Sequence, residues 1–272
     1  MATRFHGWPE QAYEVLLQLD GEPTREIRER VRRDREAQVR QPMIDLLNDL
    51  ADVDPWYEDF AVWHYASTAF WWQNQCAIVR VARNVEIGFG FSLDGLRIRA
   101  SWRYAGAAQI ALFRAAAAAD RSGRALENLL ASLAADGYEI SGDVMRRAPR
   151  GYPADHPRVA LLKHRSLIAA REIEADALHD VTPAYRACER LRPLLEWLSE
   201  HTVAALTGEP EDSTVPRCLS WSRHRKPRPS RLRRPRSTWV LWRCPNSRRR
   251  GPNCLRHWSA WPVAGPRPRW RR

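Results

Sequence analysis

Two runs of alternating residues, joined by a short turn sequence, constrain the fold of this chain more than any other feature. Apolar residues alternate with polar or small ones over 85–91 and again over 96–100, which is the pattern of strands that bury one face. Leu93-Asp94-Gly95 lies between the runs and suits a tight hairpin turn. Strands at 85–92 and 96–102 that are connected this closely run antiparallel, so the sequence predicts an antiparallel sheet with one buried face.

Other segments extend this sheet and surround it with helices. Runs rich in aromatic and β-branched residues predict further strands at 60–66, 76–82 and 167–173 and shorter ones at 138–140 and 144–147. Apolar spacing and helix-favouring composition predict helices at 8–20, 24–40, 43–51, 107–119, 123–135, 159–164 and 183–198. Because the strands are grouped between helical blocks, the predicted fold class is α+β, an antiparallel sheet flanked by helices in a single domain.

Local signals near the N-terminus make further predictions. Thr24 is the expected N-cap of the second helix, and Pro42 is expected to break or kink it. Residues 25–36 are almost all charged, with opposite charges three and four positions apart, which predicts a solvated face. The adjacent Trp71 and Trp72 would point to opposite faces of a strand, so one of them is a candidate for lining a pocket or an interface.

Charge divides the chain sharply near residue 206. Residues 207–272 hold 17 arginines and one lysine against three acidic residues, a balance of +15 in a chain whose net charge is +12. Residues 1–206 therefore carry about −3, and the high isoelectric point belongs to the C-terminal tail. We predict a folded domain over residues 1–206 and a disordered tail, rich in Arg, Pro and Trp, over 207–272.

The tail has two interpretations. Its arginines can neutralise phosphates and its tryptophans can stack on bases, which indicates a nucleic-acid tether. The alternative is a frameshift product. Lys163 and Lys226 are the only lysines, which indicates a GC-rich genome, and GC-rich DNA read out of frame yields Arg, Pro, Ser, Cys and Trp in excess.

Residues 1–206 exclude several classes of protein. No apolar leader opens the chain, and no run reaches the roughly 18 apolar residues of a membrane span. The domain has only Cys76 and Cys188, which favours a reducing compartment. We therefore expect a soluble, cytoplasmic protein without membrane contact. Neither a nucleotide-binding glycine motif nor metal-spaced His and Cys residues occur, so no cofactor and no metal are predicted.

The stretch from Ala148 to Pro157 is the strongest candidate for chemistry. In a structural interpretation, Asp155 caps a helix, Pro157 lies in its first turn and Gly151 permits a tight bend. In a functional interpretation, Asp155 orients His156 as an acid–base group. The candidate anion-binding residues are Arg146, Arg147 and Arg150, with Lys163 and Arg165 one helix later.

Several stretches together resemble a known family. They are Phe5-His6-Gly7-Trp8-Pro9, Val39-Arg40-Gln41-Pro42-Met43, Pro149-Arg150-Gly151-Tyr152-Pro153-Ala154-Asp155-His156-Pro157, Leu161-Leu162-Lys163-His164-Arg165-Ser166-Leu167 and Pro193-Leu194-Leu195-Glu196-Trp197-Leu198. Over residues 4–203 the chain resembles the bacterial and fungal family called domain of unknown function 2461. The resemblance implies a shared fold and no particular reaction.

One segment departs from that family. The family carries an Arg-Asp pair and then Ser-Lys-Asp-Lys before Pro-Tyr-Lys, whereas this chain has the aromatic segment from Phe60 to Gln75. Replacing charges by aromatic residues favours a non-catalytic or degenerate member that binds a small ligand or a partner protein. The alternatives are an enzyme for an anionic substrate with His156 as acid–base group, and nucleic-acid binding through the tail.

Overall fold

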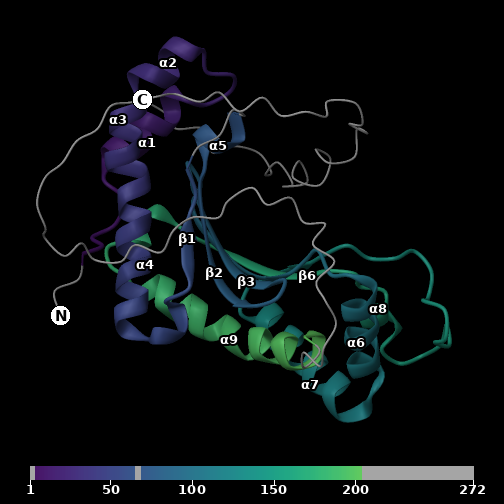
Figure 1. The fold of residues 1–272 in the computed structure, drawn as a ribbon. Helices are drawn as coiled ribbons and strands as arrows, with labels where there is room; N and C mark the ends of the chain where they lie inside the picture. The colour runs from purple at the N-terminus through teal and green to yellow at the C-terminus, as the bar shows by residue number, and fades with distance from the viewer. Residues whose placement is uncertain (1–3, 65–68, 204–272) are drawn as a thin grey trace, which may run out of the picture. The chain divides into compact units, whose positions relative to one another are not determined.

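The computed structural model describes residues 4–64 and 69–203. Six strands form one sheet in the order β1-β2-β3-β4-β6-β5, and every neighbouring pair is antiparallel (Figure 1). The strands are β1 (Phe60–Val62), β2 (Gln75–Ala82), β3 (Val85–Ser92), β4 (Gly95–Trp102), β5 (Glu139–Ser141) and β6 (Leu167–Ile173). With helices around this sheet, residues 4–203 adopt the predicted α+β fold. The tail from residue 207 onward lies outside the described residues.

The hairpin between β3 and β4 explains why the turn needs glycine. Phe91 pairs with Leu96 and Ser92 with Gly95, as the alternating pattern requires. Gly95 has φ +106°, a left-handed conformation that favours glycine. A Cβ there would also lie 2.5 Å from the carbonyl oxygen of Ile173, so β6 approaches the turn closely.

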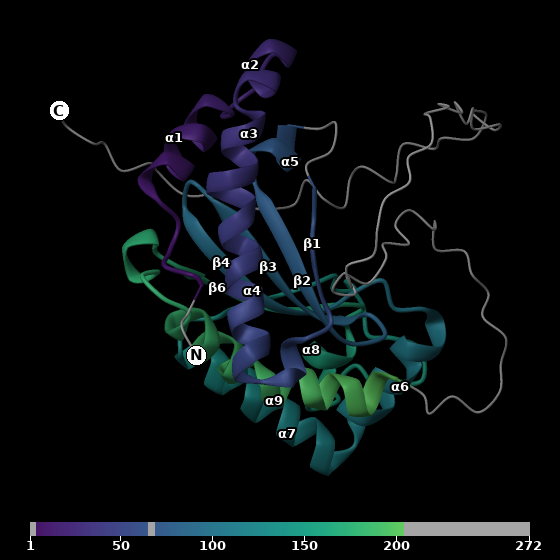
Figure 2. The ribbon, with the colours of Figure 1, turned by 60° about the vertical axis from the view of Figure 1, so that its left-hand side comes forward.

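Most of the helices gather near the two ends of the sheet (Figures 1 and 2). Near one end lie α1 (Glu10–Gln18), α2 (Arg25–Arg30), α3 (Arg32–Asp34), the π-helical η1 (Arg35–Arg40) and α5 (Ala69–Gln73); near the other lie α6 (Ala107–Ala118), α7 (Asp120–Ala135) and α8 (Val159–Leu162). The remaining helical elements are α4 (Gln41–Val53), η2 (Pro55–Tyr57), η3 (Ala175–Ala177) and α9 (Thr182–Thr202).

The core lies between the helices and one face of the sheet. Helix α9 packs across β2, β3, β4 and β6. Trp8 stacks on Phe91 with ring centroids 4.0 Å apart, and Trp102 stacks on Phe113 at 4.7 Å. Buried Asp49 accepts hydrogen bonds from the backbone N–H groups of Arg4 and Phe5, which fixes the start of the domain against α4.

Four local predictions are wrong or incomplete. The predicted strand 60–66 ends at Val62, and 144–147 contributes only an isolated bridge between Val144 and His164. Trp71 and Trp72 lie on helix α5 instead of a strand. Thr24 does cap α2, but the predicted helix over 24–40 is divided into α2, α3 and the π-helical η1, and Pro42 lies in the first turn of α4, directly after η1.

Candidate functional site

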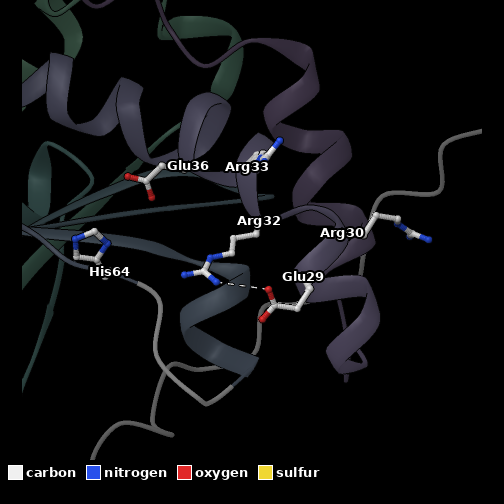
Figure 3. Close-up of a pocket in the computed structure, with 6 residues that line it drawn as sticks. All are labelled: Glu29, Arg30, Arg32, Arg33, Glu36 and His64. Atoms are coloured by element: carbon white, nitrogen blue, oxygen red, sulfur yellow. Dashed lines mark hydrogen bonds and ion pairs between the residues drawn. The ribbon is translucent and has the colours of Figure 1, made fainter. Parts of the chain in front are cut away.

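A surface hollow of about 850 Å³ lies beside α2, α3, η1 and the chain that leaves β1. Its lining side chains are Glu29, Arg30, Arg32, Arg33, Glu36 and His64. Figure 3 shows Arg32 extended toward the His64 side of the hollow, while the Arg30 and Arg33 side chains point away from it. Arg32 is also the partner of Glu29, with 3.5 Å between their charged atoms. Arg32, Glu36 and His64 therefore form the interior of this hollow, which we call the His64 hollow.

Buried Arg35 holds the wall of the hollow together, and this contradicts its predicted place on a solvated face. Its side chain is fully buried. It donates hydrogen bonds to the carbonyl oxygens of Trp71, Trp72 and Asn74, at 2.8–3.0 Å, and to Oε1 of Gln75 at 3.2 Å. Because one guanidinium carries five donors, a single residue joins η1 to both α5 and β2.

A second arginine joins the same helical turn to β1. Arg40 donates to Oε1 of Glu36 at 2.6 Å and to the carbonyl oxygen of Val62 at 3.5 Å. Glu36 and His64 are thereby carried by segments that are tied to each other, although they are far apart in the sequence. The π-helical turn that presents Glu36 is a geometry that often marks functional positions in helices.

The surroundings of His64 keep its imidazole neutral near pH 7. Burial lowers the pKa of His64, the positive charges of Arg40 and Arg35 lower it further, and Glu36 opposes this shift. A neutral imidazole offers one hydrogen-bond donor and one acceptor. The hollow thus supplies one inward-pointing guanidinium, an uncharged imidazole and a carboxylate, and none of its six lining side chains carries a hydroxyl or a thiol.

The structure gives the predicted pair Asp155 and His156 different neighbours from those expected. The N-cap position of α8 is Arg158, without a capping side chain, so Asp155 does not cap that helix and Pro157 precedes its first turn. Instead, Nδ1 of His156 accepts a hydrogen bond from the backbone N–H of Arg158 at 3.0 Å. No hydrogen bond joins Asp155 to His156 within residues 4–64 and 69–203. Gly151 does adopt a left-handed φ of +86° in the bend.

The other residues predicted to bind anions are not joined to His156 by any contact among the described residues. Arg150 is exposed, and Lys163 is half-buried at the end of α8. Arg165 is paired with Asp143 at 2.8 Å. Arg146 and Arg147 are exposed in the loop before the bend. An enzyme with His156 as its acid–base group stays a prediction.

The stretch that contains His156 does have a clear structural role. Arg158 is 5% exposed and donates hydrogen bonds to the carbonyl oxygens of Ala117 and Ala118, at the end of α6, and to Asp120. Cations favour helix C-termini because the last carbonyl groups lack partners there. Gly123 allows this approach, since a Cβ would lie 2.5 Å from Nε of Arg158.

Two features are absent from the described residues. No group of three or more His, Cys, Asp or Glu side chains among them is placed to hold a metal ion. No helix in the same part of the chain combines the length and apolar character of a membrane span.

Comparison with known proteins finds one similar family. Residues 71–197 match the model of the family described as conserved hypothetical protein (DUF2461). Over these residues the chain is similar to the DUF2461 family. The match extends from α5 into α9 and includes the bend around Gly151. It begins at Trp71, so residues 4–70, over which we also expected the resemblance, lie outside it. No curated protein and no solved structure matches this chain.

The His64 hollow therefore lies at the N-terminal side of the DUF2461 match. All six of its lining residues precede residue 71. Sequence reasoning did not find this site, since it assigned the charged residues of α2 and α3 to a solvated face and gave His64 no role. The usable signal was the aromatic segment from Phe60 to Gln75, which contains His64 and differs from the family pattern.

Proposed function

We propose that this protein binds a small carboxylate-bearing ligand in the His64 hollow and does not transform it. The observation that carries the proposal is the convergence of Arg32 and His64 in one hollow of about 850 Å³. A guanidinium recognises a carboxylate through two parallel hydrogen bonds. The neutral imidazole of His64 adds a donor or an acceptor for a second polar group of the ligand.

The charges of the hollow support a carboxylate over a phosphate. Glu29 and Glu36 share the lining with Arg32, so a doubly charged anion would meet two like charges at close range. A singly charged carboxylate is balanced by Arg32, and Glu36 can accept a hydrogen bond from an ammonium or hydroxyl group on the same ligand. The proposal therefore extends to hydroxy acids and amino acids.

Binding without turnover is supported by what lines the hollow. Of the nucleophiles that enzymes use, the lining offers no hydroxyl, thiol or amine, and its two carboxylates, Glu29 and Glu36, are paired with arginines. Arg32 and His64 are suited to holding a ligand, and the Arg35 and Arg40 contacts make the site preformed.

Thermal shift measurements on the full chain test this proposal. Acetate, lactate and glutamate are added separately, and at least one is expected to raise the melting temperature. The increase should disappear in Arg32→Ala. It should persist in the matched control Arg25→Ala, which removes an exposed arginine of α2 outside the lining. The proposal is contradicted if the compound raises the melting temperature of Arg32→Ala as much as that of wild type. It is also contradicted if the stabilising compound is consumed or converted by the protein.

A further inference from the structure

A second hollow, of about 240 Å³, lies at the opposite end of the sheet, where the β2–β3 turn meets the end of β4. Arg80, Arg83, Glu86, Arg103 and Tyr104 contribute side chains to it. The lining thus contains three arginines and one carboxylate. Because nothing in the His64 hollow takes part, the two hollows can be tested separately. We call this one the Arg83 hollow.

The ion pairs around the Arg83 hollow leave an excess of positive charge. Arg103 pairs with Glu86 at 3.2 Å, and both side chains are largely buried. Arg80 pairs with Asp59 at 3.1 Å, but both of these side chains are more than half exposed. Exposed pairs of this kind interact weakly. Arg83 is exposed in the turn itself and adds a third guanidinium.

The backbone around this hollow is held in an uncommon conformation. Asn84 and Tyr104 line the hollow and are the two non-glycine residues with positive φ, +65° and +59°, in the part of the chain that the structure describes. Such conformations are unfavourable for tyrosine and cluster at ligand sites. The Tyr104 side chain is 66% exposed, and the guanidinium of Arg103 lies 5.5 Å from its ring.

Hydrogen bonds hold the two strained residues and the first turn of α6 together. Nδ2 of Asn84 donates to the carbonyl oxygen of Tyr104 at 3.2 Å and to Oε1 of Gln109 at 2.6 Å. Nε2 of Gln109 donates to the carbonyl oxygen of Arg83 at 3.3 Å. The first turn of α6 has no acidic residue and no capping side chain, so its helix dipole adds positive potential to the same corner.

We propose that the Arg83 hollow binds the phosphate group of a small organic phosphate. Guanidinium groups match the oxygen atoms of phosphate in a bidentate manner, and the lining carries three arginines against one carboxylate. The volume accommodates a phosphate with a small organic group, whereas typical drug-sized ligands occupy sites of about 300–1,000 Å³. The exposed ring of Tyr104 forms the outer edge of the site and is available to contact the organic part.

Calorimetric titration of the full chain with inorganic phosphate tests the inference. Wild-type protein is expected to bind saturably. Arg83→Ala should weaken binding by roughly tenfold or more, because it removes a charge-assisted interaction. The matched control Arg121→Ala, which removes an exposed arginine of α7 outside the lining, should bind within about twofold of wild type. The arginines of the tail are unchanged in both variants.

Glu86→Gln provides a second test with the opposite sign. It removes the one carboxylate of the lining, so phosphate affinity should rise several-fold. Absence of saturable phosphate binding overturns the inference, as does equal weakening by Arg83→Ala and Arg121→Ala, or an unchanged affinity in Glu86→Gln. Arg32→Ala should leave phosphate binding intact, which separates this result from that of the His64 hollow.

Discussion

At the scale of the residue, His64 links the candidate ligand site to pH. Burial and the neighbouring arginines lower the pKa of His64 in the folded chain, whereas in the unfolded chain it returns to about 6.5. The unfolded state therefore binds a proton more readily than the folded state. Neutral His64 therefore contributes fully to the free energy of unfolding above its pKa in the unfolded chain. This contribution is lost as pH falls through its lower pKa in the folded chain.

We predict that the stability of His64→Gln depends less on pH than that of wild-type protein. The melting temperature of wild-type protein should fall more steeply between pH 7.5 and 5 than that of His64→Gln, by a small amount because the side chain is only partly removed from solvent. Thermal unfolding across a pH series measures the difference. His179→Gln, which replaces an exposed histidine outside the hollow, is the control and should follow wild type. Parallel curves for wild type and His64→Gln would contradict the prediction.

At the scale of the element, Pro193 interrupts an otherwise regular helix. It lies exposed inside α9, where it has no N–H to donate to the carbonyl oxygen of Glu189 and its ring crowds that turn. Pro193→Ala should raise the free energy of unfolding by about 1 kcal/mol, less than the full penalty of proline because the helix has already adjusted. Urea denaturation followed by circular dichroism measures this. Glu196→Ala, at another exposed position of α9, should change stability by less than about 0.5 kcal/mol.

The elements also show where sequence reasoning succeeded. The bounds of β3 and β6 were predicted correctly because each run has clear strand composition and well-marked ends. Helix α5 was missed, since a short aromatic run such as 69–73 favours a strand by composition, whereas the helix is held by Arg35, which lies far away in the sequence and donates to the carbonyl oxygens of Trp71 and Trp72. Neither hollow was predicted, because each joins segments far apart in the chain and neither contains a local motif.

At the scale of the whole molecule, charge distinguishes the domain from the tail. The tail contributes +15 to a chain of +12, so binding of the full chain to a single-stranded oligonucleotide should weaken steeply as salt rises. Truncation after Leu206 should abolish this binding while circular dichroism confirms that the helices are retained. Binding that survives truncation would assign it to the domain.

The intact mass of the expressed protein tests the frameshift interpretation, since a chain made in another frame has a different mass.

The pairing of β4 with β6 has a consequence for how the chain acquires its fold. Ser92 pairs with Gly95 across a single turn, whereas Trp102 pairs with Leu167 across a long stretch of chain that includes α6 and α7. Closing long loops slows folding, so the β2–β3–β4 meander is expected to form before β6 arrives. During that interval β4 presents an unpaired edge that can recruit a second chain. Aggregation during synthesis should therefore respond to the speed with which β6 docks, and slower synthesis at lower temperature should increase the yield of folded protein.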